Sequence, residues 1–537
     1  MEKIGSMSEL QTMGWADHGS GGAVAAGTQE GVAAGIAVLR DGGNAVDAAI
    51  ASILALSVSH YGMFAFGGEV PFMFYNASTR NVQVLSGQGV APRSREGMAW
   101  FEANGIPSDG DVKTAPPPAV LDLCTTALRL YGTTSFEHVA SYTRKLLEPG
   151  LESWHTPLAA TLARLVEAEK QTQGGREERL LGVRNRFYEG DIADALEAYY
   201  VSEGSFLRKT DLASHTTLVE DPVSVTYHDH TVYKCGPWTQ GPWLCQALRL
   251  LETFDLQHLG HLSEDYIHTV TEAMKLALAD RDAYYADPRF ADVPLAALFS
   301  EKYAKLRRTL MDPERAATSV PPGDPRAMKP RCDAVCDPDW VGGTTTCVVS
   351  DRFGNVVSAT PSANRPYHLC DELGIAHGNR LRCLNTTPGH PNHIEAGKRP
   401  RVTLTPTLVV KADGSVLAVS VAGGDLQDQT TLNCLLNHLD FGMTPAESVT
   451  APRFSTGHHE NSFKSDAKRG AMEAPAGLVL DDGIGEEAAA RLQTKGHQVK
   501  RAEAAIAHPV MLHLDAKTGV SHAAGDPKAG RYAQAIQ

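Results

Sequence analysis

The sequence has no excess of positive charge, few aromatic residues and no long apolar run. Its 537 residues include 49 Lys and Arg against 63 Asp and Glu, a net charge of −14, and 7% are aromatic. A chain of this charge does not concentrate a polyanion at its surface, so nucleic acid is not an expected partner. The longest apolar stretch, from Ala45 to Val58, contains Asp47 and is too short to span a bilayer. Because the first residues also lack the apolar core of a signal peptide, we expect a cytoplasmic protein without membrane contact.

The cysteines form neither a disulfide nor a zinc pattern. There are nine of them, an odd number scattered through a long chain, which indicates reduced thiols. Cys332 and Cys336 are the one close pair, and no second pair lies at the spacing of a structural zinc site. The sequence therefore predicts no disulfide framework, no metal and no cofactor.

What the chain does contain is typical of a large globular protein of mixed α/β structure. It is 42% hydrophobic and 21% charged, and its length suits either three to four domains or one large layered fold. Residues 1–20 are polar, and we expect them to form an irregular arm. A short apolar strand then precedes two helical patterns, separated at Gly42 and Gly43, where glycine permits a helix end.

Two hairpin patterns frame the middle of the chain. Residues 61–87 alternate like paired strands with a turn at 76–80, and helical patterns follow to about Leu310. Residues 311–340 are rich in Pro, Asp and Arg without a hydrophobic period, which indicates a linker or an exposed loop. β-Branched runs then flank a turn at 351–355, the pattern of a second hairpin. An exposed segment is thus predicted to lead directly into a buried strand.

Gly343 and Thr344 stand at this junction, within the run Gly-Gly-Thr-Thr-Thr. A threonine hydroxyl is a poor nucleophile unless a base lies beside it. The α-amine of Thr344 becomes such a base only when Thr344 is the first residue of a chain. Cleavage of the Gly343–Thr344 bond creates that arrangement, and the glycines before it allow the strained geometry of the attack. A threonine-rich strand start after a glycine turn is also an ordinary structural feature, so the local residues leave both interpretations open.

Longer motifs resemble the γ-glutamyltranspeptidase family of N-terminal nucleophile hydrolases, in the family's order from residue 42 to residue 533. The resemblance implies an α+β fold, a four-layer αββα sandwich. It also implies self-cleavage into a large chain, residues 21–343 after the arm, and a small chain, residues 344–537, which stay associated as one globular unit. The motifs are GGNAVDAA (42–49), FYEGDIADAL (187–196), the helix of 266–294, GHPNHIEAGKRPRVTLTPTLVV (389–410), AGGD (422–425), DFGMTPAESVTAPRF (440–454) and GDPKAGRYA (525–533).

The resemblance assigns roles to five residues. Thr344 matches the nucleophile, and Ser362 matches the position whose hydroxyl contacts the amine of that threonine. Asn364 matches a polar residue on the substrate side. Gly423 and Gly424 match the paired glycines whose N–H groups form the oxyanion hole, and such donors typically contribute about 3–4 kcal/mol of transition-state stabilisation. Taken alone, two adjacent glycines are more often an ordinary turn.

Other matched positions are expected to be structural. The pairs Asp280–Arg281 and Asp287–Pro288 match strongly patterned family positions, but they predict a helix end with its salt bridges and a turn. We therefore leave them out of the site. Thr345 follows the nucleophile as in the family, and it either bonds to the α-amine or simply begins the strand.

The sequence departs from the family where a γ-glutamyl head is held. Gln88 stands at the position aligned with a carboxylate-binding Arg, and Val402 and Thr403 replace a pair of serines. The carboxylate that would hold the α-amine is missing near Cys383. Since charge-assisted hydrogen bonds contribute about 1.5–3 kcal/mol each, losing two removes about 3–6 kcal/mol of preference for that head. A replacement cation would suit a substrate with a carboxylate but no amine, although surface arginines are usually just solvated. The candidate cations are Arg93, Arg380 and Arg382, and the predicted substrate contacts are Gln88, Asn364, Arg380 and Thr403.

The sequence therefore predicts a self-processing amidohydrolase that acts on a small amide through an acyl-enzyme, with hydrolysis favoured over transfer. Residues 378–400 resemble the family's non-transpeptidase branch, which includes cephalosporin-acylase-like and oxamate amidohydrolase members. One alternative is a genuine γ-glutamyl transferase or glutathione hydrolase with a re-sited clamp. The other is a scaffold relative that is never cleaved, but a scaffold has no reason to retain the nucleophile, its partner and the oxyanion glycines together. The natural substrate and the formation of a homo-oligomer are left open.

Overall fold

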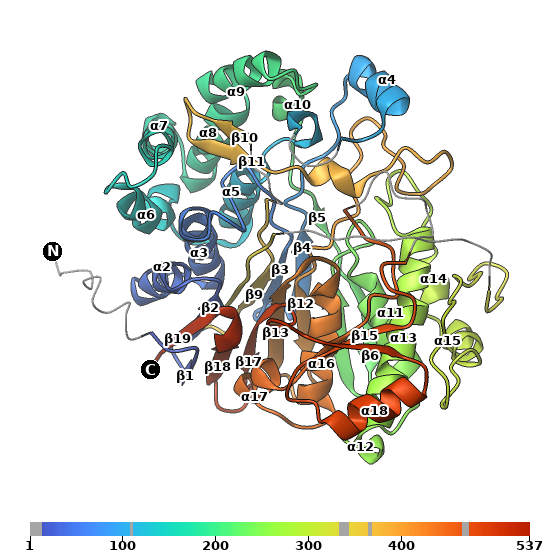
Figure 1. Ribbon diagram of the computed structural model, residues 1–537. Coiled ribbons are helices and arrows are strands. Elements are labelled where there is room, and N and C mark those ends of the chain that lie inside the picture. The colour runs from blue at the N-terminus through green and yellow to red at the C-terminus, as the bar shows by residue number, and fades with distance from the viewer. Residues whose placement is uncertain (1–12, 108–110, 332–342, 364–367, 464–471) are drawn as a thin grey trace.

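The computed structural model describes residues 13–107, 111–331, 343–363, 368–463 and 472–537. Two seven-stranded antiparallel sheets lie face to face between two layers of helices (Figure 1). The first sheet has the order β1-β18-β17-β13-β12-β7-β6, and the second has the order β19-β2-β8-β9-β3-β4-β5. This arrangement is the predicted four-layer αββα sandwich.

The elements are distributed along the whole chain. The strands of the first sheet are β1 (Ala16–Gly19), β6 (Val223–Tyr227), β7 (His230–Lys234), β12 (Thr407–Val410), β13 (Val416–Ala422), β17 (His508–Leu514) and β18 (Ser521–Gly525). Those of the second are β2 (Gly22–Ala26), β3 (Phe72–Asn76), β4 (Asn81–Leu85), β5 (Val219–Glu220), β8 (Cys347–Asp351), β9 (Val356–Ala359) and β19 (Tyr532–Ile536). The short strands outside them are β10 (His368–Cys370), β11 (Ile375–His377), β14 (Phe454–Ser455), β15 (Gly477–Leu480) and β16 (Gln498–Arg501).

Each sheet has its own helical layer. The second sheet is covered by a layer built from α2 (Gln29–Arg40), α3 (Ala45–Ser59), α5 (Val120–Tyr131), α6 (Phe136–Leu147), α7 (His155–Gln171), α8 (Arg176–Tyr188) and α9 (Asp191–Ser202). The first is covered by α11 (Pro242–Leu251), α13 (Glu264–Tyr284), α15 (Glu301–Arg308), α16 (Gln427–Leu439), α17 (Pro445–Thr450) and α18 (Glu486–Thr494). Peripheral helices are α4 (Arg95–Asn104), α10 (Lys209–Ala213), α12 (Leu256–Leu259), α14 (Leu295–Leu298) and the 3-10 turns η1 (Val112–Thr114), η2 (Arg380–Cys383), η3 (Gly424–Leu426) and η4 (Pro527–Ala529).

Local sequence chemistry explains how the chain turns from α2 into α3. Gly42 has a φ of 93°, a conformation that glycine adopts without a steric penalty, and it directly follows the end of α2. Asn44 then accepts hydrogen bonds from the N–H groups of Val46 and Asp47, and Asp47 accepts one from the N–H of Asn44. This reciprocal capping box starts α3 where the sequence predicted a second helix.

Alternation along the central strands sorts side chains between two kinds of core. Ala23 and Val348 face the other sheet and belong to the core between the sheets. Val24 and Val349, one residue further along, belong to the core beneath the helices. Because both faces of these strands are buried, they read as continuous apolar runs.

The hairpin of β8 and β9 forms as predicted, and its turn is anchored on a helix. Asp351 Oδ1 accepts hydrogen bonds from the N–H groups of Phe353 and Asn355, at 2.8 and 3.0 Å. Asp351 Oδ2 accepts one from the N–H of Ala45 at 2.8 Å, at the start of α3. These contacts fix the turn relative to α3. The pairing of β8 with β2 and β9 then sets the position of the opposite end of the hairpin, where Thr344 lies.

Two parts of the chain differ from the sequence expectations. The predicted arm of residues 1–20 contains β1, which pairs with β18, so its described part is not irregular. The stretch predicted as helical up to Leu310 contains β5, β6 and β7. In β6 the buried Val225 and Tyr227 alternate with exposed residues. This alternation is the pattern of a strand, but in a segment of only five residues it is a weak signal. Of the predicted linker, residues 311–331 are described and contain neither helix nor named strand.

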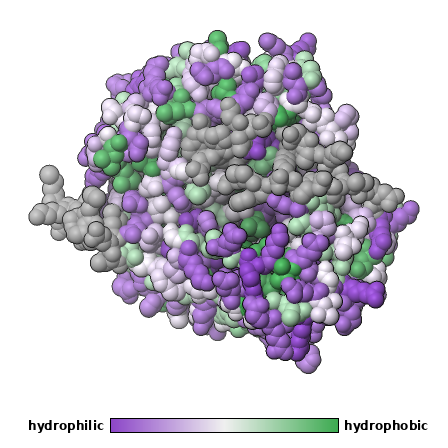
Figure 2. All heavy atoms as spheres, in the orientation of Figure 1, coloured by the Kyte–Doolittle hydropathy of each residue, from purple (hydrophilic) through white to green (hydrophobic). Residues whose placement is uncertain are grey.

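The described surface is mainly polar. On the face in Figure 2, hydrophilic residues predominate and apolar ones are scattered among them. Among the described helices, none combines the length and the apolar character needed to cross a membrane. The seven described cysteines are buried free thiols, as predicted, while Cys332 and Cys336 lie outside the described residues.

Buried histidines make the fold sensitive to acid. Burial lowers the pKa of seven of them from 6.5 to about 3 or 4: His60, His377, His438, His458, His497, His508 and His513. They are neutral in the folded chain, whereas the unfolded chain takes up their protons as the pH falls through 6.5. The free energy of unfolding must therefore decrease between pH 6.5 and 4, by up to about 1.4 kcal/mol per pH unit for each fully buried histidine.

We expect urea unfolding of the full chain to show a free energy of unfolding several kcal/mol lower at pH 5 than at pH 7. Four buried carboxyls contribute in the opposite sense, because burial raises the pKa of Glu69, Asp280, Asp428 and Asp440, but they are fewer than the seven histidines. A free energy of unfolding that is constant or rises toward pH 5 would contradict this prediction.

Candidate active site

The β8–β9 hairpin brings Thr344 and Ser362 together. The N–H of Thr345 donates to Pro361 O at 2.8 Å, which extends the pairing beyond the ends of both strands. Thr344 Oγ1 lies 3.4 Å from Ser362 Oγ, and both side chains are buried. The two residues are therefore neighbours inside the protein, although 18 positions separate them in the chain.

Ser362 also holds the peptide bond that precedes Thr344. In the unbroken chain, Ser362 Oγ donates to Gly343 O at 2.6 Å. The backbone of Ser362 is itself fixed by Glu69, with one N–H···O bond in each direction at 2.8 and 2.9 Å. The hydroxyl of Thr344 and the hydrogen-bonded carbonyl of Gly343 thus both adjoin Ser362 Oγ.

Gln427 lies at the start of α16, the helix that follows β13 of the first sheet, and its side chain reaches Thr344. Its side-chain amide lies 3.4 Å from Thr344 Oγ1. In the amide orientation that satisfies its hydrogen bonds, the nitrogen donates to Thr403 O at 2.8 Å and to Val421 O at 3.2 Å. In that orientation the amide oxygen, rather than the nitrogen, is the atom that faces Thr344 Oγ1.

Gly423 and Gly424 form the turn between β13 and α16. Their φ angles are 151° and 58°, both in the range that favours glycine. Among the described residues, neither of their N–H groups donates to a protein group. The turn lies just before Gln427, at the N-terminal end of α16, where free N–H groups and the helix dipole favour negative charge. These donors are therefore available to an oxyanion.

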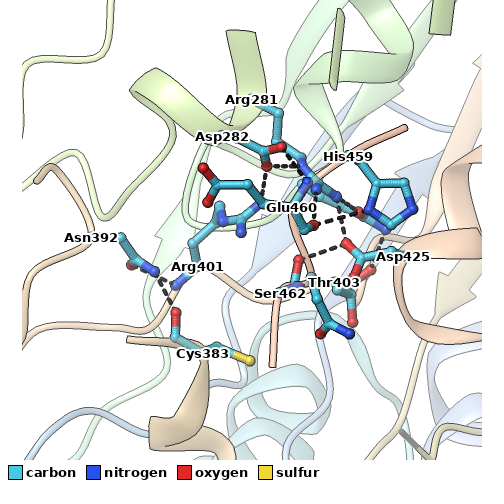
Figure 3. A network of polar contacts seen from close by, with 12 residues as sticks. Arg281, Asp282, Cys383, Asn392, Arg401, Thr403, Asp425, His459, Glu460 and Ser462 are labelled. Atoms are coloured by element: carbon cyan, nitrogen blue, oxygen red, sulfur yellow. Dashed lines mark hydrogen bonds and ion pairs between the residues drawn. The ribbon is translucent and has the colours of Figure 1, made fainter. Parts of the chain in front are cut away.

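A buried network of polar contacts that includes Arg281 and Asp425 (Figure 3) adjoins this glycine turn. Arg281, near the end of α13, donates to Asp425 Oδ1 at 2.5 Å and to Gln240 Oε1 at 2.8 Å. Gln240 in turn donates to Gly424 O and to Thr403 O, each at 3.2 Å. Although burial alone raises it, the ion pair with Arg281 holds the pKa of Asp425 at about 2. The carbonyl of Gly424 and the side chain of Asp425 are thus held in place before any ligand binds.

Arg281 makes salt bridges near the end of α13, as the sequence predicted, but its contacts also extend to the glycine turn. Asp280 lies 3.5 Å from Arg307, and Asp287 is paired with Arg289 and Arg399. Arg281, by contrast, reaches the glycine turn through Gln240. The sequence gives no signal for that contact, because Gln240 and Arg281 are 41 positions apart.

Arg380 is not a surface residue. It is fully buried, its Nε donates to Glu69 Oε1 at 2.7 Å, and its Nη2 donates to Ser362 Oγ at 2.6 Å. Its Nη1 has no partner among the described residues. Arg93, another candidate cation, is exposed and donates to Ser214 Oγ at 3.2 Å. Arg380 is therefore the candidate that the structure brings to Ser362.

Two of the remaining predicted substrate contacts, Gln88 and Thr403, are also buried. Gln88 Oε1 and Thr403 Oγ1 both lack a partner among the described residues. Gln88 comes to this region because the preceding residue accepts a hydrogen bond from the N–H of Val70, next to Glu69. Val402 packs in the core between the sheets, so it supplies no polar contact. Asn364 lies outside the described residues.

Sequence reasoning missed Glu69, Gln427 and His60. Glu69 follows a pair of glycines, and Gln427 closely follows the glycine turn. Paired glycines indicate a close approach of the backbone to another part of the protein, so they could have drawn attention to both residues. His60, at the end of α3, has no such signal. Its Nδ1 lies 2.8 Å from Thr345 Oγ1, and burial is the main cause that lowers its pKa to about 3. The hydroxyl of Thr345, just before β8, therefore shares a hydrogen bond with a neutral imidazole.

One cluster elsewhere has the residue types of a metal site. His268, Glu272 and His497 are buried and place their ligand atoms within 4.8 Å of one another. However, His268 Nδ1 and His497 Nε2 share a hydrogen bond at 2.8 Å, and His268 Nε2 bonds to Asp312 O. Lys275 Nζ donates to Glu272 at 2.7 Å. Because these atoms are already engaged with one another, we assign no metal to the cluster.

The four-layer sandwich is the fold of an N-terminal nucleophile hydrolase, and comparison with known proteins agrees. The sequence model of the family described as gamma-glutamyltranspeptidase matches residues 31–173 and 154–536. The chain belongs to this family, and it is an enzyme of the N-terminal nucleophile hydrolase type.

Three similar proteins span the chain almost completely. A glutathione hydrolase proenzyme of Bacillus subtilis (strain 168) is 27% identical, over 95% of this chain and 90% of its own length. An acylase ACY 1 proenzyme of Pseudomonas sp. (strain SE83) is 28% identical, over 87% and 85%. The solved structure of LmbA2991HD superposes with a TM-score of 0.85, is 29% identical, and covers 97% of this chain and 99% of its own. Relatives whose names give different activities thus match most of the length of this chain.

Proposed function

We propose that this enzyme is a self-processing amidohydrolase in which Thr344 is the nucleophile. The observation that carries the proposal is the set of contacts at the junction, where Thr344 Oγ1 adjoins Ser362 Oγ and Ser362 holds Gly343 O. Cleavage between Gly343 and Thr344 frees the α-amine of Thr344. That amine then takes the proton of the hydroxyl as it attacks a substrate amide.

The rest of the cycle uses groups that lie around Thr344. The N–H groups of Gly423 and Gly424 stabilise the tetrahedral oxyanion, and the amine of Thr344 passes its proton to the leaving nitrogen. Water then releases the acyl group, and we propose that this hydrolysis is favoured over transfer to an amine. Gln427 orients the hydroxyl through its amide oxygen.

The sheet order supports association of the two chains after cleavage. In the second sheet, β8 and β9 of the small chain lie between β2 and β3 of the large chain. In the first sheet, β12 pairs with β7 across the same division. Separating the chains would expose both sheet interiors, so we infer that they remain together. N-terminal sequencing and intact mass measurement test the proposal: the small chain must begin at Thr344.

We infer that the substrate carries a carboxylate or carbonyl group but no ammonium group. The predicted contacts Arg380, Gln88 and Thr403 each hold one buried polar atom without a partner among the described residues, two of them able to donate. The carboxylates near them are already paired, Glu69 with Arg380 and Asp425 with Arg281. A buried ammonium group would therefore have no free counter-ion there.

This specificity predicts that glutaryl p-nitroanilide is hydrolysed faster than γ-glutamyl p-nitroanilide, which differs only by the added amine. Leaving that charge unpaired costs about 1.5–3 kcal/mol, which corresponds to about 10- to 100-fold in kcat/KM. Release of p-nitroaniline measures both rates. If the γ-glutamyl compound is cleaved as fast or faster, the alternative of a glutathione hydrolase with a re-sited clamp is favoured instead. A chain that is never cleaved and hydrolyses neither compound would support the scaffold alternative.

A further inference from the structure

A buried line of polar groups leads from Glu69 to the peptide bond before Thr344. Glu69 Oε1 accepts from Arg380 Nε at 2.7 Å, Arg380 Nη2 donates to Ser362 Oγ at 2.6 Å, and Ser362 Oγ donates to Gly343 O at 2.6 Å. The side chains of Glu69, Arg380 and Ser362 are all at most 2% exposed. Nothing in the hydrolysis of a substrate requires this line to end on Gly343, since that carbonyl belongs to the chain itself.

We propose that Arg380, held by Glu69, is a positioning residue of the self-cleavage step and acts through Ser362. This inference rests on the proposed function, because it concerns the cut that creates the small chain. It assigns the buried ion pair a role in maturation that is separate from contact with substrate.

The direction of the hydrogen bonds carries the argument. A guanidinium group only donates, so Arg380 occupies a lone pair of Ser362 Oγ and cannot accept its proton. The hydroxyl proton of Ser362 is thereby directed to Gly343 O. A cation behind a hydroxyl also makes that hydroxyl a stronger donor, and donors aimed at developing charge lower the barrier in a buried site.

Glu69 explains how a cation is tolerated at this place. A buried charge without a partner is costly, and Glu69 supplies the partner while holding the guanidinium plane in one orientation. Because the backbone of Glu69 is hydrogen-bonded to that of Ser362, the acid and the serine move as one unit. The pair is therefore fixed relative to the bond that is cut.

The chemical step balances within the chain and one water molecule. Thr344 Oγ attacks the carbonyl carbon of Gly343, a C–O bond forms, and negative charge develops on the oxygen that Ser362 contacts. The C–N bond to Thr344 then breaks, and the hydroxyl proton moves to the nitrogen, which leaves an ester. Water hydrolyses the ester to the carboxylate of Gly343 and the free hydroxyl and amine of Thr344.

The test follows cleavage of the full-length chain after pulse-labelled synthesis, on denaturing gels. We expect Arg380→Ala to be cleaved at least 10-fold more slowly than the wild type, with partial recovery in Arg380→Lys. Guanidinium chloride at about 50 mM should accelerate Arg380→Ala and leave the wild type unchanged, while urea at the same concentration has no effect. A small ion that fills the vacated place restores a donor, whereas it does not repair a general loss of packing.

Matched variants separate this role from simple loss of a buried arginine. Arg307 is equally buried and lies 3.5 Å from Asp280, on the far helical layer, so Arg307→Ala disturbs packing without touching the line. Equal cleavage rates for Arg380→Ala and wild type would overturn the proposal. Slow cleavage that guanidinium does not accelerate, matched by equally slow cleavage of Arg307→Ala, would also overturn it. If the wild type is not cleaved, or Thr344→Ala is, the proposed function itself fails first.

Discussion

Thr344→Ala should yield one unbroken chain of 57.6 kDa with no amidase activity. The substitution removes the hydroxyl that attacks Gly343 and, after cleavage, the substrate. No other hydroxyl can take over from the same position, since Ser362 is committed to Gly343 O and Thr345 to His60. The wild type should instead give two chains of about 37 and 21 kDa, in proportion to their lengths. We expect a loss of activity of about 10³-fold or more.

Two neighbouring variants make this result specific. Thr344→Ser keeps a hydroxyl and should still be cleaved, though more slowly. Thr346→Val removes a hydroxyl two residues further along, one that has no partner among the described residues, while keeping the shape of the side chain. It should be cleaved like the wild type. A cleaved Thr344→Ala chain would place the nucleophile elsewhere and end the proposed mechanism.

Gly423→Ala should lower kcat by about 100- to 1,000-fold in the mature enzyme, the loss expected when an oxyanion donor of about 3–4 kcal/mol is displaced. A Cβ atom at this position would lie 2.7 Å from the Cβ of Ala507, and a φ of 151° is strained for alanine. The turn must therefore shift, and its N–H groups with it. We expect self-cleavage to survive, because in the unbroken chain Ser362 rather than the glycine turn holds the reacting carbonyl.

Gly442→Ala is the matched control for this substitution. Gly442 also has a positive φ, 69°, but nothing lies within 4 Å of the added Cβ. It should cost a similar small backbone strain, about 1 kcal/mol, without loss of kcat. Steady-state kinetics and thermal unfolding of both variants decide the matter. Unchanged kcat in a folded Gly423→Ala enzyme would remove this turn from the catalytic machinery.

The local parts of the fold could be predicted because their signals lie within a few residues. Asn44 and Asp47 encode a helix start, and Asp351 with Asn355 encodes the hairpin turn. β6 and β7 were not predicted, because their signal does not lie within a few residues. Their burial pattern depends on the sheet that they join, and five-residue strands carry little pattern of their own.

The site could be predicted only as far as the resemblance assigned residues one by one. It indicated Thr344 and the glycine turn, but it presented Arg380 as a candidate surface cation for substrate. The structure buries Arg380 against Glu69, a residue 311 positions away in the chain. Gln427 lies 83 positions from Thr344, at the start of α16, a helix that covers the other sheet.

The sequence by itself determined the class of fold, the hairpin that leads from Thr344, and the junction at which the chain is expected to be cut. These follow from periodicity, turn chemistry and family motifs, all written along the chain. Only the tertiary structure decided which polar groups meet at that junction. Two stacked sheets bring together side chains from distant segments, and a charge or hydroxyl buried there is costly unless it finds a hydrogen-bond partner.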